Sequence, residues 1–108
     1  MLDPTHIETS GAYSFSGIWD WICLSPKKQN PSLKEINVIA NELKVVIYNE
    51  SDFEWAEQCS ALVNPNCKLF LQPEWSRYKQ NIGSIVEFIK KNTKWRISLQ
   101  AHKFMRIP

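Results

Sequence analysis

The chain has 108 residues, 44% of them hydrophobic and 22% charged, and its 13 basic and 11 acidic residues give a formal net charge of +2. This length supports one hydrophobic core rather than two, and the apolar share excludes a disordered chain. Its longest apolar runs have four residues, far fewer than the ~18 of a membrane-spanning helix. The first residues include acids but no bases, so we expect no signal peptide. These properties predict a single soluble domain over residues 1–108.

The three cysteines, Cys23, Cys59 and Cys67, are odd in number and 36 and 8 positions apart. This spacing excludes a self-contained disulfide framework and a CxxC-type metal site. Cysteines used in this way are typical of a reducing compartment, so we expect a cytoplasmic protein.

The chain predicts five strands and three helices. The chain begins with the strands Thr5–Thr9 and Trp21–Leu24, and the three later strands, Leu43–Tyr48, Lys68–Leu71 and Trp95–Leu99, each follow a helix. The first helix begins after Ser32 and has the apolar stripe Ile36, Ile39, Ala40 and Leu43. The second begins after Ser51 with the stripe Trp55, Cys59 and Leu62, and the third has the stripe Ile82, Ile85, Val86 and Ile89. Ser32 and Ser51 are each followed three residues later by Glu, the spacing of a capping box.

Two of the strands contain continuous apolar runs, Val45–Ile47 and Leu69–Leu71. Runs of this kind predict strands buried on both faces of a parallel sheet. The alternation of strands and helices predicts an α/β fold built from right-handed βαβ units. Five such strands form an arc of a barrel or a half-open sheet with a long apolar edge, so another chain or a further part of this one should cover that edge.

Polar groups follow each of the five strands, where ligands bind in parallel sheets. They are Thr9–Gly11, Ser25–Lys27, Asn49, Gln72–Trp75 and Gln100–His102. Strand ends also run into polar loops in proteins without a site there, so the pattern alone leaves both interpretations open.

Charge is unevenly distributed along the chain. Residues 1–76 hold five bases against ten acids, and residues 77–108 hold eight bases against one acid. A basic segment that also contains Trp95 and Phe104 is compatible with binding to a nucleic-acid backbone. A solvated helix face followed by a strand explains the same pattern and is the more common case.

Five blocks of sequence together resemble a known family. They are Glu8–Gly11, Trp19–Lys28, Glu42–Val46, Leu71–Trp75 and Trp95–Lys103. In order and spacing they are similar to the C-terminal half of 7-carboxy-7-deazaguanine synthases, which are radical S-adenosylmethionine (SAM) enzymes. The resemblance runs from about Ile7 to Pro108 and includes the terminal Ile-Pro. It implies the C-terminal part of a partial (β/α) barrel, and we expect either a homodimer or a missing N-terminal half as the partner.

The activity that this resemblance implies is a lyase reaction in queuosine biosynthesis, a pathway of tRNA modification. Enzymes of the family convert 6-carboxy-5,6,7,8-tetrahydropterin into 7-carboxy-7-deazaguanine with loss of ammonia. They use SAM, a 4Fe-4S cluster and Mg²⁺.

The resemblance also implies roles for individual residues. The SAM-contacting positions are Ser25, Pro26, Lys27, Gln72, Pro73, Glu74 and Trp75, together with Glu8 and Ser10, while His102 and the terminal carboxylate of Pro108 match groups that hold the pterin. A hydroxyl and an ammonium at Ser25 and Lys27 suit ribose hydroxyls and a carboxylate. The imidazole of His102 can donate to a pterin carbonyl or carboxylate. The family varies at Glu74 and Trp75.

Several family features are absent from the sequence. It contains neither the cluster-binding CxxxCxxC loop nor the Gly-Gly-Glu-Pro loop, and Ala101 stands where the family usually has Thr. The three cysteines are better explained as small buried hydrophobic residues. We therefore expect no catalytic residue, cluster ligand or Mg²⁺ ligand in this chain, which would be an inactive C-terminal portion of a truncated, split or frame-shifted enzyme. Two alternatives stay open: a binding partner that complements an N-terminal half, and a basic nucleic-acid-binding module.

Overall fold

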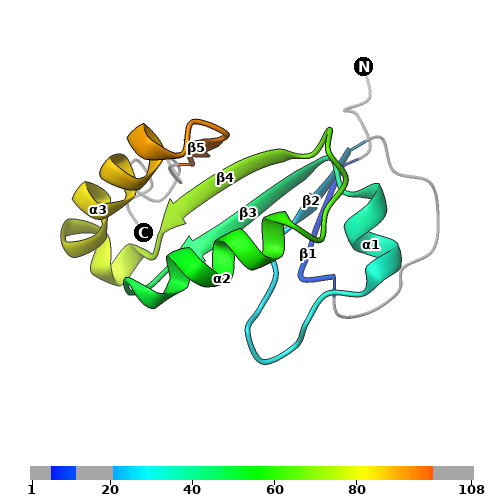
Figure 1. Cartoon of the computed structure of the whole chain (residues 1–108). Coiled ribbons are helices and arrows are strands. Elements are labelled where there is room, and N and C mark those ends of the chain that lie inside the picture. The colour runs from blue at the N-terminus through cyan, green and yellow to red at the C-terminus, as the bar shows by residue number, and fades with distance from the viewer. Residues whose placement is uncertain (1–5, 12–20, 99–108) are drawn as a thin grey trace, which may run out of the picture.

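The computed structural model describes residues 6–11 and 21–98, which form five strands and three α-helices (Figure 1). In chain order the elements are β1 (His6–Thr9), β2 (Trp21–Leu24), α1 (Lys34–Ile39), β3 (Glu42–Ile47), α2 (Ser51–Ser60), β4 (Lys68–Pro73), the 3₁₀ turn η1 (Trp75–Arg77), α3 (Tyr78–Lys91) and β5 (Trp95–Ile97). The predicted strand Trp21–Leu24 is confirmed at both ends. The first residue of the predicted strand Thr5–Thr9 and the last of Trp95–Leu99 lie outside the described residues.

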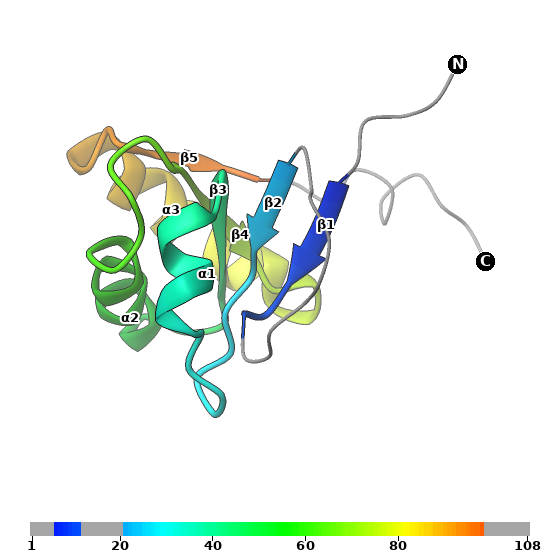
Figure 2. The ribbon, with the colours of Figure 1, turned by 90° about the vertical axis from the view of Figure 1, so that its right-hand side faces the viewer.

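All five strands are parallel and stand in the sheet in the order of the sequence, β1-β2-β3-β4-β5. The longest pairing joins β3 and β4 over six residues, from Glu42 opposite Lys68 to Ile47 opposite Pro73. The predicted α/β fold with a parallel sheet is therefore confirmed. In the described part of the chain β1 has a strand on one side only and forms an edge of the sheet (Figure 2).

One face of the sheet is covered by helices and carries the hydrophobic core. Leu43, Val45 and Ile47 alternate along β3 and are fully buried. They share one cluster with residues of all three helices, namely Ile36 of α1, Ala56 of α2 and Ile85 of α3. Right-handed crossovers between strands that follow one another in the sheet place every helix on the same side, which explains this arrangement.

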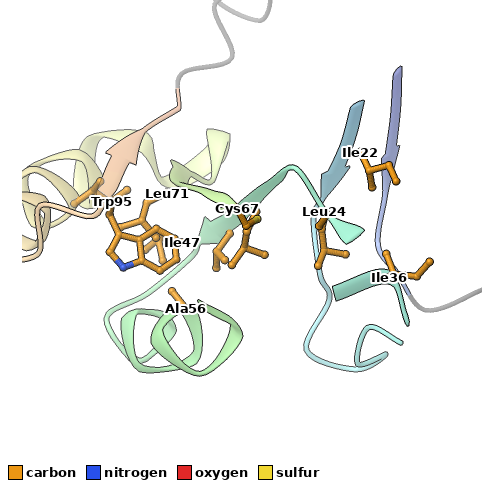
Figure 3. Close-up of a cluster of buried hydrophobic side chains, with 12 residues drawn as sticks. Ile22, Leu24, Ile36, Ile47, Ala56, Cys67, Leu71 and Trp95 are labelled. Atoms are coloured by element: carbon orange, nitrogen blue, oxygen red, sulfur yellow. The ribbon is translucent and has the colours of Figure 1, made fainter. Parts of the chain in front are cut away.

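The buried indole of Trp95 extends this core to β5. Figure 3 shows it beside Ile47 and Leu71, above Ala56 of α2. Its Nε1 donates a 2.6 Å hydrogen bond to Glu57 Oε1, so the polar edge of the ring is satisfied although Trp95 is only 1% exposed. The short strand β5 is thus fixed to a helix as well as to β4.

The other face of the sheet is covered by no helix of the described residues, and we call it the open face. It carries Cys23 of β2, Glu42, Lys44 and Val46 of β3, and Lys68, Phe70 and Gln72 of β4, as the registers show. Residues 42, 44 and 46 are half-buried, in alternation with the buried core positions. The prediction that β3 is buried on both faces is therefore wrong for the described part, because all the helices pack on one side.

The first predicted helix also differs from the structure. Ser32 does not cap α1: its hydroxyl donates to Asn37 Oδ1, and the helix has only six residues. Ile39 is 50% exposed, and Leu43 lies in β3 rather than on the helix. A side chain-to-side chain bond has here replaced the side chain-to-backbone bond of a capping box.

The second and third helices form where they were predicted, but parts of their stripes differ. The Ser51 hydroxyl donates to Asn49 Oδ1 rather than capping α2. Leu62 lies beyond the end of α2 and is exposed, and the core position of that helix is Ala56. In α3, Ile85 is buried as predicted, whereas Val86 is exposed.

Gly11 holds together the turn after β1. Its φ of +75° lies in the left-handed region, and its carbonyl accepts a 2.6 Å hydrogen bond from the Leu33 amide. A Cβ at this position would lie 2.6 Å from Leu24 Cδ1 and 2.7 Å from Ser32 Cβ. Only glycine combines this backbone conformation with so close an approach.

Replacing Gly11 by Ala should therefore lower the free energy of unfolding by about 2–4 kcal/mol, from left-handed strain and overpacking together. Gly83→Ala is the matched control, because a Cβ at Gly83 in α3 meets nothing within 4 Å. Alanine's helix propensity should make that variant about 0.5–1 kcal/mol more stable. Urea unfolding followed by circular dichroism measures both free energies. Equal effects of the two substitutions would contradict the requirement for glycine at position 11.

Candidate functional site

The carboxyl ends of the parallel strands meet at one edge of the sheet, where backbone hydrogen bonds tie the loops together. The Ser25 amide donates to the Thr9 carbonyl at 2.7 Å, the Glu74 amide to the Ile47 carbonyl at 3.0 Å and the Ser98 amide to the Leu71 carbonyl at 2.8 Å. The segments after β2, β4 and β5 are thereby held next to β1, β3 and β4, respectively. Four of the five predicted polar groups begin at this edge.

Two buried polar atoms at this edge have no hydrogen-bond partner in the described part of the chain, Ser25 Oγ and Gln72 Oε1. Ser25 follows β2 directly, and Gln72 lies opposite Val46 on the open face. Their residues are only 9% and 6% exposed. The Cys23 thiol lies near the Ser25 hydroxyl but is a weak hydrogen-bonding group. A buried polar atom left unpaired costs about 1–3 kcal/mol, so both atoms fit contact with a polar ligand.

Further from this edge, the polar groups of the open face satisfy one another. Lys44 Nζ lies 3.0 Å from Glu8 Oε2, and Trp21 Nε1 donates to Glu42 Oε1 at 2.7 Å. The ammonium of Lys68 lies 5.7 Å from the centroid of the Trp21 ring. Glu8 is therefore engaged with Lys44, and a contact between Glu8 and SAM stays a prediction.

The side chains of the loop after β2 differ in their exposure to solvent. Pro26 is buried, whereas Lys27 is exposed and forms an isolated bridge with Asn30. Lys27 and Lys28 line an open cavity of about 350 Å³ together with Val46, Tyr48 and other residues of the β3–α2 connection. An ammonium at the rim of a cavity suits an anionic ligand group.

Asp52 in the first turn of α2 joins three parts of this edge. One carboxylate oxygen, Oδ2, accepts hydrogen bonds from the backbone amides of Tyr48 at 2.7 Å and Asn49 at 3.0 Å, and the other pairs with Lys28. Burial alone raises the pKa of Asp52, but the bonds from Lys28 and from the two amides outweigh it, so its pKa lies below the ordinary value. The carboxylate is therefore charged under all ordinary conditions.

The segment after β4 continues the edge on the other side of β3. Glu74 accepts a 3.0 Å hydrogen bond from the Ser76 amide and so caps η1. The guanidinium of Arg77 lies 5.0 Å from the centroid of the Tyr48 ring, which links this segment to the end of β3. Pro73 is buried and Trp75 is 46% exposed. The exposed indole of Trp75 offers an apolar surface, and the buried amide of Gln72, three residues before it, offers a polar contact.

The structure thus brings most of the predicted SAM-contacting residues to one edge. Ser10, which directly precedes Gly11, lies there too and is half-buried. His102 and Pro108 lie outside the described residues, as do Gln100 and Ala101. Sequence reasoning missed Lys28, Asp52 and Trp55. The run Asn49-x-x-Asp52 at a strand-to-helix junction is the signal that was available for Asp52.

The three cysteines do not fit an iron–sulfur cluster, because they lie on separate elements: Cys23 in β2, Cys59 in α2 and Cys67 just before β4. Burial raises the pKa of Cys23 to about 12, and of Cys59 and Cys67 to about 11. For Cys23 the charges of Glu42 and Glu8 add to this effect. Residues 6–11 and 21–98 contain no group of three His, Cys, Asp or Glu side chains arranged to hold a metal ion. Cluster ligands must be thiolates, so no cluster chemistry is assigned to these residues.

Comparison with known proteins gives long matches to one kind of enzyme. The chain is 54% identical over 103 residues to the 7-carboxy-7-deazaguanine synthase of Flavobacterium psychrophilum, a match that covers 95% of this chain and 49% of that protein. It is 43% identical over 102 residues to the synthase of the same name from Synechocystis, covering 94% of this chain and 49% of the relative. No family model matches the chain.

The chain is a homologue of the 7-carboxy-7-deazaguanine synthases. It spans about half the length of the curated relatives it matches. The predicted resemblance is confirmed at this level, while the assignment to the C-terminal half of the family stays a prediction.

The fold agrees with that of a solved structure. The crystal structure of QueE from Escherichia coli superposes with a TM-score of 0.67 at 24% identity, over 88% of this chain and 43% of that chain. The shared feature is the parallel sheet with its helices, as predicted. Within the described segments no helix is both long and apolar enough to cross a membrane.

The unpaired Ser25 hydroxyl gives a stability test. Ser25→Ala should leave the free energy of unfolding unchanged or raise it by up to about 1 kcal/mol, because an unsatisfied buried hydroxyl is removed. Ser32→Ala, which breaks the 2.6 Å bond to Asn37, should lower it by about 1 kcal/mol. Urea titrations of both variants decide this, and a clear loss of stability in Ser25→Ala would show that the hydroxyl already has a partner.

The thiols of Cys23 and Cys67 are buried and that of Cys59 is half-buried, which predicts slow alkylation and a pH-dependent stability. Iodoacetamide at about pH 8 should label the folded chain far more slowly than the chain in urea, since the thiolate is the reactive form. Unfolded thiols ionise near their ordinary pKa of 9.0, whereas the folded ones stay protonated up to about 11–12. Stability should therefore fall as the pH rises above 9, and less steeply in Cys23→Ala. Rapid labelling of the folded chain would contradict this.

Proposed function

We propose that the chain is the SAM- and pterin-binding half of a 7-carboxy-7-deazaguanine synthase. The whole enzyme would convert 6-carboxy-5,6,7,8-tetrahydropterin into 7-carboxy-7-deazaguanine with loss of ammonia, in queuosine biosynthesis. The observation that carries the proposal is the pair of buried, unpartnered atoms Ser25 Oγ and Gln72 Oε1 at the carboxyl edge of the sheet. The homology to synthases of this name supports it.

The residues at this edge match the chemistry of SAM. When bound, SAM supplies the 5′-deoxyadenosyl group with which the radical reaction of such enzymes begins. Gln72 Oε1 is an acceptor for an amino or hydroxyl group, and the Ser25 hydroxyl can donate or accept. The ammonium of Lys27 would pair with the methionyl carboxylate. The exposed ring of Trp75 offers an apolar surface to the adenine.

The pterin-binding part of the proposal rests on the family resemblance. His102 and the carboxylate of Pro108 are the proposed pterin ligands, and both lie outside the described residues. A carboxylate there would accept hydrogen bonds from the pterin amino group, and the imidazole would donate to a carbonyl or carboxylate.

The iron–sulfur cluster and Mg²⁺ would be held by another polypeptide segment. This chain has no CxxxCxxC loop, and its three cysteines lie on separate parts of the fold, with Cys23 and Cys67 buried and Cys59 half-buried. We propose that the isolated chain binds SAM without producing 5′-deoxyadenosine. The second segment would dock on the open face and along β1, which has no outer neighbour strand among the described residues, whether that segment is a separate N-terminal half or a further part of the same chain.

The alternative of a nucleic-acid-binding module gains no specific support. Of the basic residues in and after α3, Lys90 lies 3.6 Å from Glu87 and Lys94, just before β5, lies 3.0 Å from Glu57. Carboxylates thus partly neutralise the segment on which that alternative depends. A mobility shift that weakens steeply with salt would revive it.

Titration calorimetry with SAM tests the binding half of the proposal. Lys27→Ala and Gln72→Leu should each weaken SAM binding by about tenfold or more, since each removes a polar contact to the ligand. Lys91→Ala is the control, because Lys91 is an exposed lysine in the last turn of α3, which leads to the amino end of β5 rather than to the carboxyl ends of the strands. No binding by the unaltered chain, or equal losses in Lys91→Ala, would contradict the proposal.

Co-expression with the part of the Flavobacterium psychrophilum synthase that this chain does not match tests the rest. The complex should bind a cluster under anaerobic reconstitution and form 7-carboxy-7-deazaguanine, whereas this chain alone should do neither. Stoichiometric cluster absorbance in the isolated chain would overturn the idea of a missing half. A complex that forms but shows no turnover would favour a binding role alone.

A further inference from the structure

The residue after the proposed SAM-contacting loop makes two contacts with α2. The ammonium of Lys28 pairs with a carboxylate oxygen of Asp52 and lies 5.5 Å from the centroid of the Trp55 ring. Lys28 is half-exposed, with 44% of its side chain accessible, whereas the Asp52 side chain is 3% exposed. The interaction therefore joins a surface loop to a fixed and buried charge.

Asp52 is fixed by contacts that do not involve Lys28. Its Oδ2 accepts the backbone amides of Tyr48 and Asn49, so the carboxylate is tied to the end of β3. An ion pair to a buried, doubly hydrogen-bonded carboxylate is more strongly oriented than one between two exposed side chains. The pair has the geometry of an anchor on which a loop can be held.

The loop itself has few other restraints. Among residues 6–11 and 21–98, the one backbone bond from the Ser25–Asn30 segment to another segment is the 2.7 Å bond from the Ser25 amide to the Thr9 carbonyl, and within the loop the Asn30 amide donates to the Lys27 carbonyl at 3.2 Å. Lys27 to Asn30 are all exposed. Without a side-chain anchor, a ligand that contacts Ser25 and Lys27 would first have to order this segment.

We propose that Asp52 and Lys28, with the Trp55 ring, act as a clamp that positions the Ser25–Lys27 loop for the ligand. Asp52 and Lys28 are thus positioning residues rather than ligand contacts. The inference rests on the proposed SAM-binding function and adds residues that the sequence comparison did not single out. Immobilising a loop before binding removes part of the ordering free energy from the binding step, which raises affinity without a new contact.

Calorimetric titration of the chain with SAM tests the clamp. Lys28→Met keeps the aliphatic stem and removes the charge, and it should weaken binding by about tenfold, as expected for the ordering of one or two loop side chains. Asp52→Asn should have a similar effect, and the double variant should lose no more than either single one, because both act through the same pair. Lys28→Arg keeps the charge and the contact with the ring, so it should restore affinity to near the original value.

Lys94→Met is the matched control. Lys94 pairs at 3.0 Å with Glu57 of α2, the helix that also carries Asp52, and it is similarly exposed, at 50%. It directly precedes β5 and so lies at the amino end of a strand, away from the carboxyl ends where the loop lies. It should leave SAM affinity unchanged. Thermal melts of every variant separate a loss of folding from a loss of affinity.

The outcomes distinguish a failure of the clamp from a failure of the proposed SAM-binding function. If the unaltered chain binds SAM and Lys27→Ala weakens it, while Lys28→Met and Asp52→Asn do not, the clamp is wrong and the proposed function stands. Additive losses in the double variant, or an equal loss in Lys94→Met, would also overturn the clamp. Absence of SAM binding by the unaltered chain would remove the proposed function together with the clamp built on it.

Discussion

Packing of all three helices against one face of a parallel sheet determines the rest of this structure. Leu43, Val45 and Ile47 of β3 each lose their entire exposed surface on this face, and at roughly 25 cal/mol per Å² such side chains dominate the free energy of folding. The residues between them are freed from core packing. They form the open face, which carries the Lys44–Glu8 ion pair and the unpaired amide oxygen of Gln72.

The polar groups of the open face follow a gradient along the strands. Away from the carboxyl edge, Lys44 and Glu8 pair with each other, and Glu42 accepts from the Trp21 indole. At that edge, Ser25 and Gln72 are buried without partners. Since a buried polar atom without a partner is destabilising, its presence at one end of the sheet is best explained by contact with something other than the described residues.

Much of the fold follows from local patterns in the sequence. The strand Trp21–Leu24 and the core position Ile85 are as predicted, because a short apolar run and a helical stripe each leave one favourable structure. The stripes failed where tertiary contacts competed with them. Ser32 bonds Asn37 rather than the helix amides, and Leu43, though spaced like a helical residue, pairs with Leu24 and Leu69 in the sheet.

The site was predictable in its residues but not in its organisation. The positions of Ser25 and Gln72 followed from strand ends and family resemblance, because carboxyl ends of parallel strands converge. That their polar atoms would be buried and unpaired depends on tertiary packing, which a pattern does not encode; β4 also continues to Pro73, so Gln72 lies within the strand rather than after it as predicted. Asp52 was missed for a similar reason: a carboxylate in the first turn of a helix is usually a solvated charge near the helix dipole, and only the fold shows that it reaches Tyr48, Asn49 and Lys28 together.

Strict alternation along β3 has an evolutionary consequence. A shift of register by one residue would place Glu42 and Lys44 in the core, so the pairing of β3 with β4 is strongly specified. The odd-numbered positions of β3 thus pack in the core and determine the fold, whereas the even-numbered positions form the open face. Substitutions at the even positions can accumulate without unfolding the sheet, so a sheet of this kind can change its surface chemistry while its architecture persists.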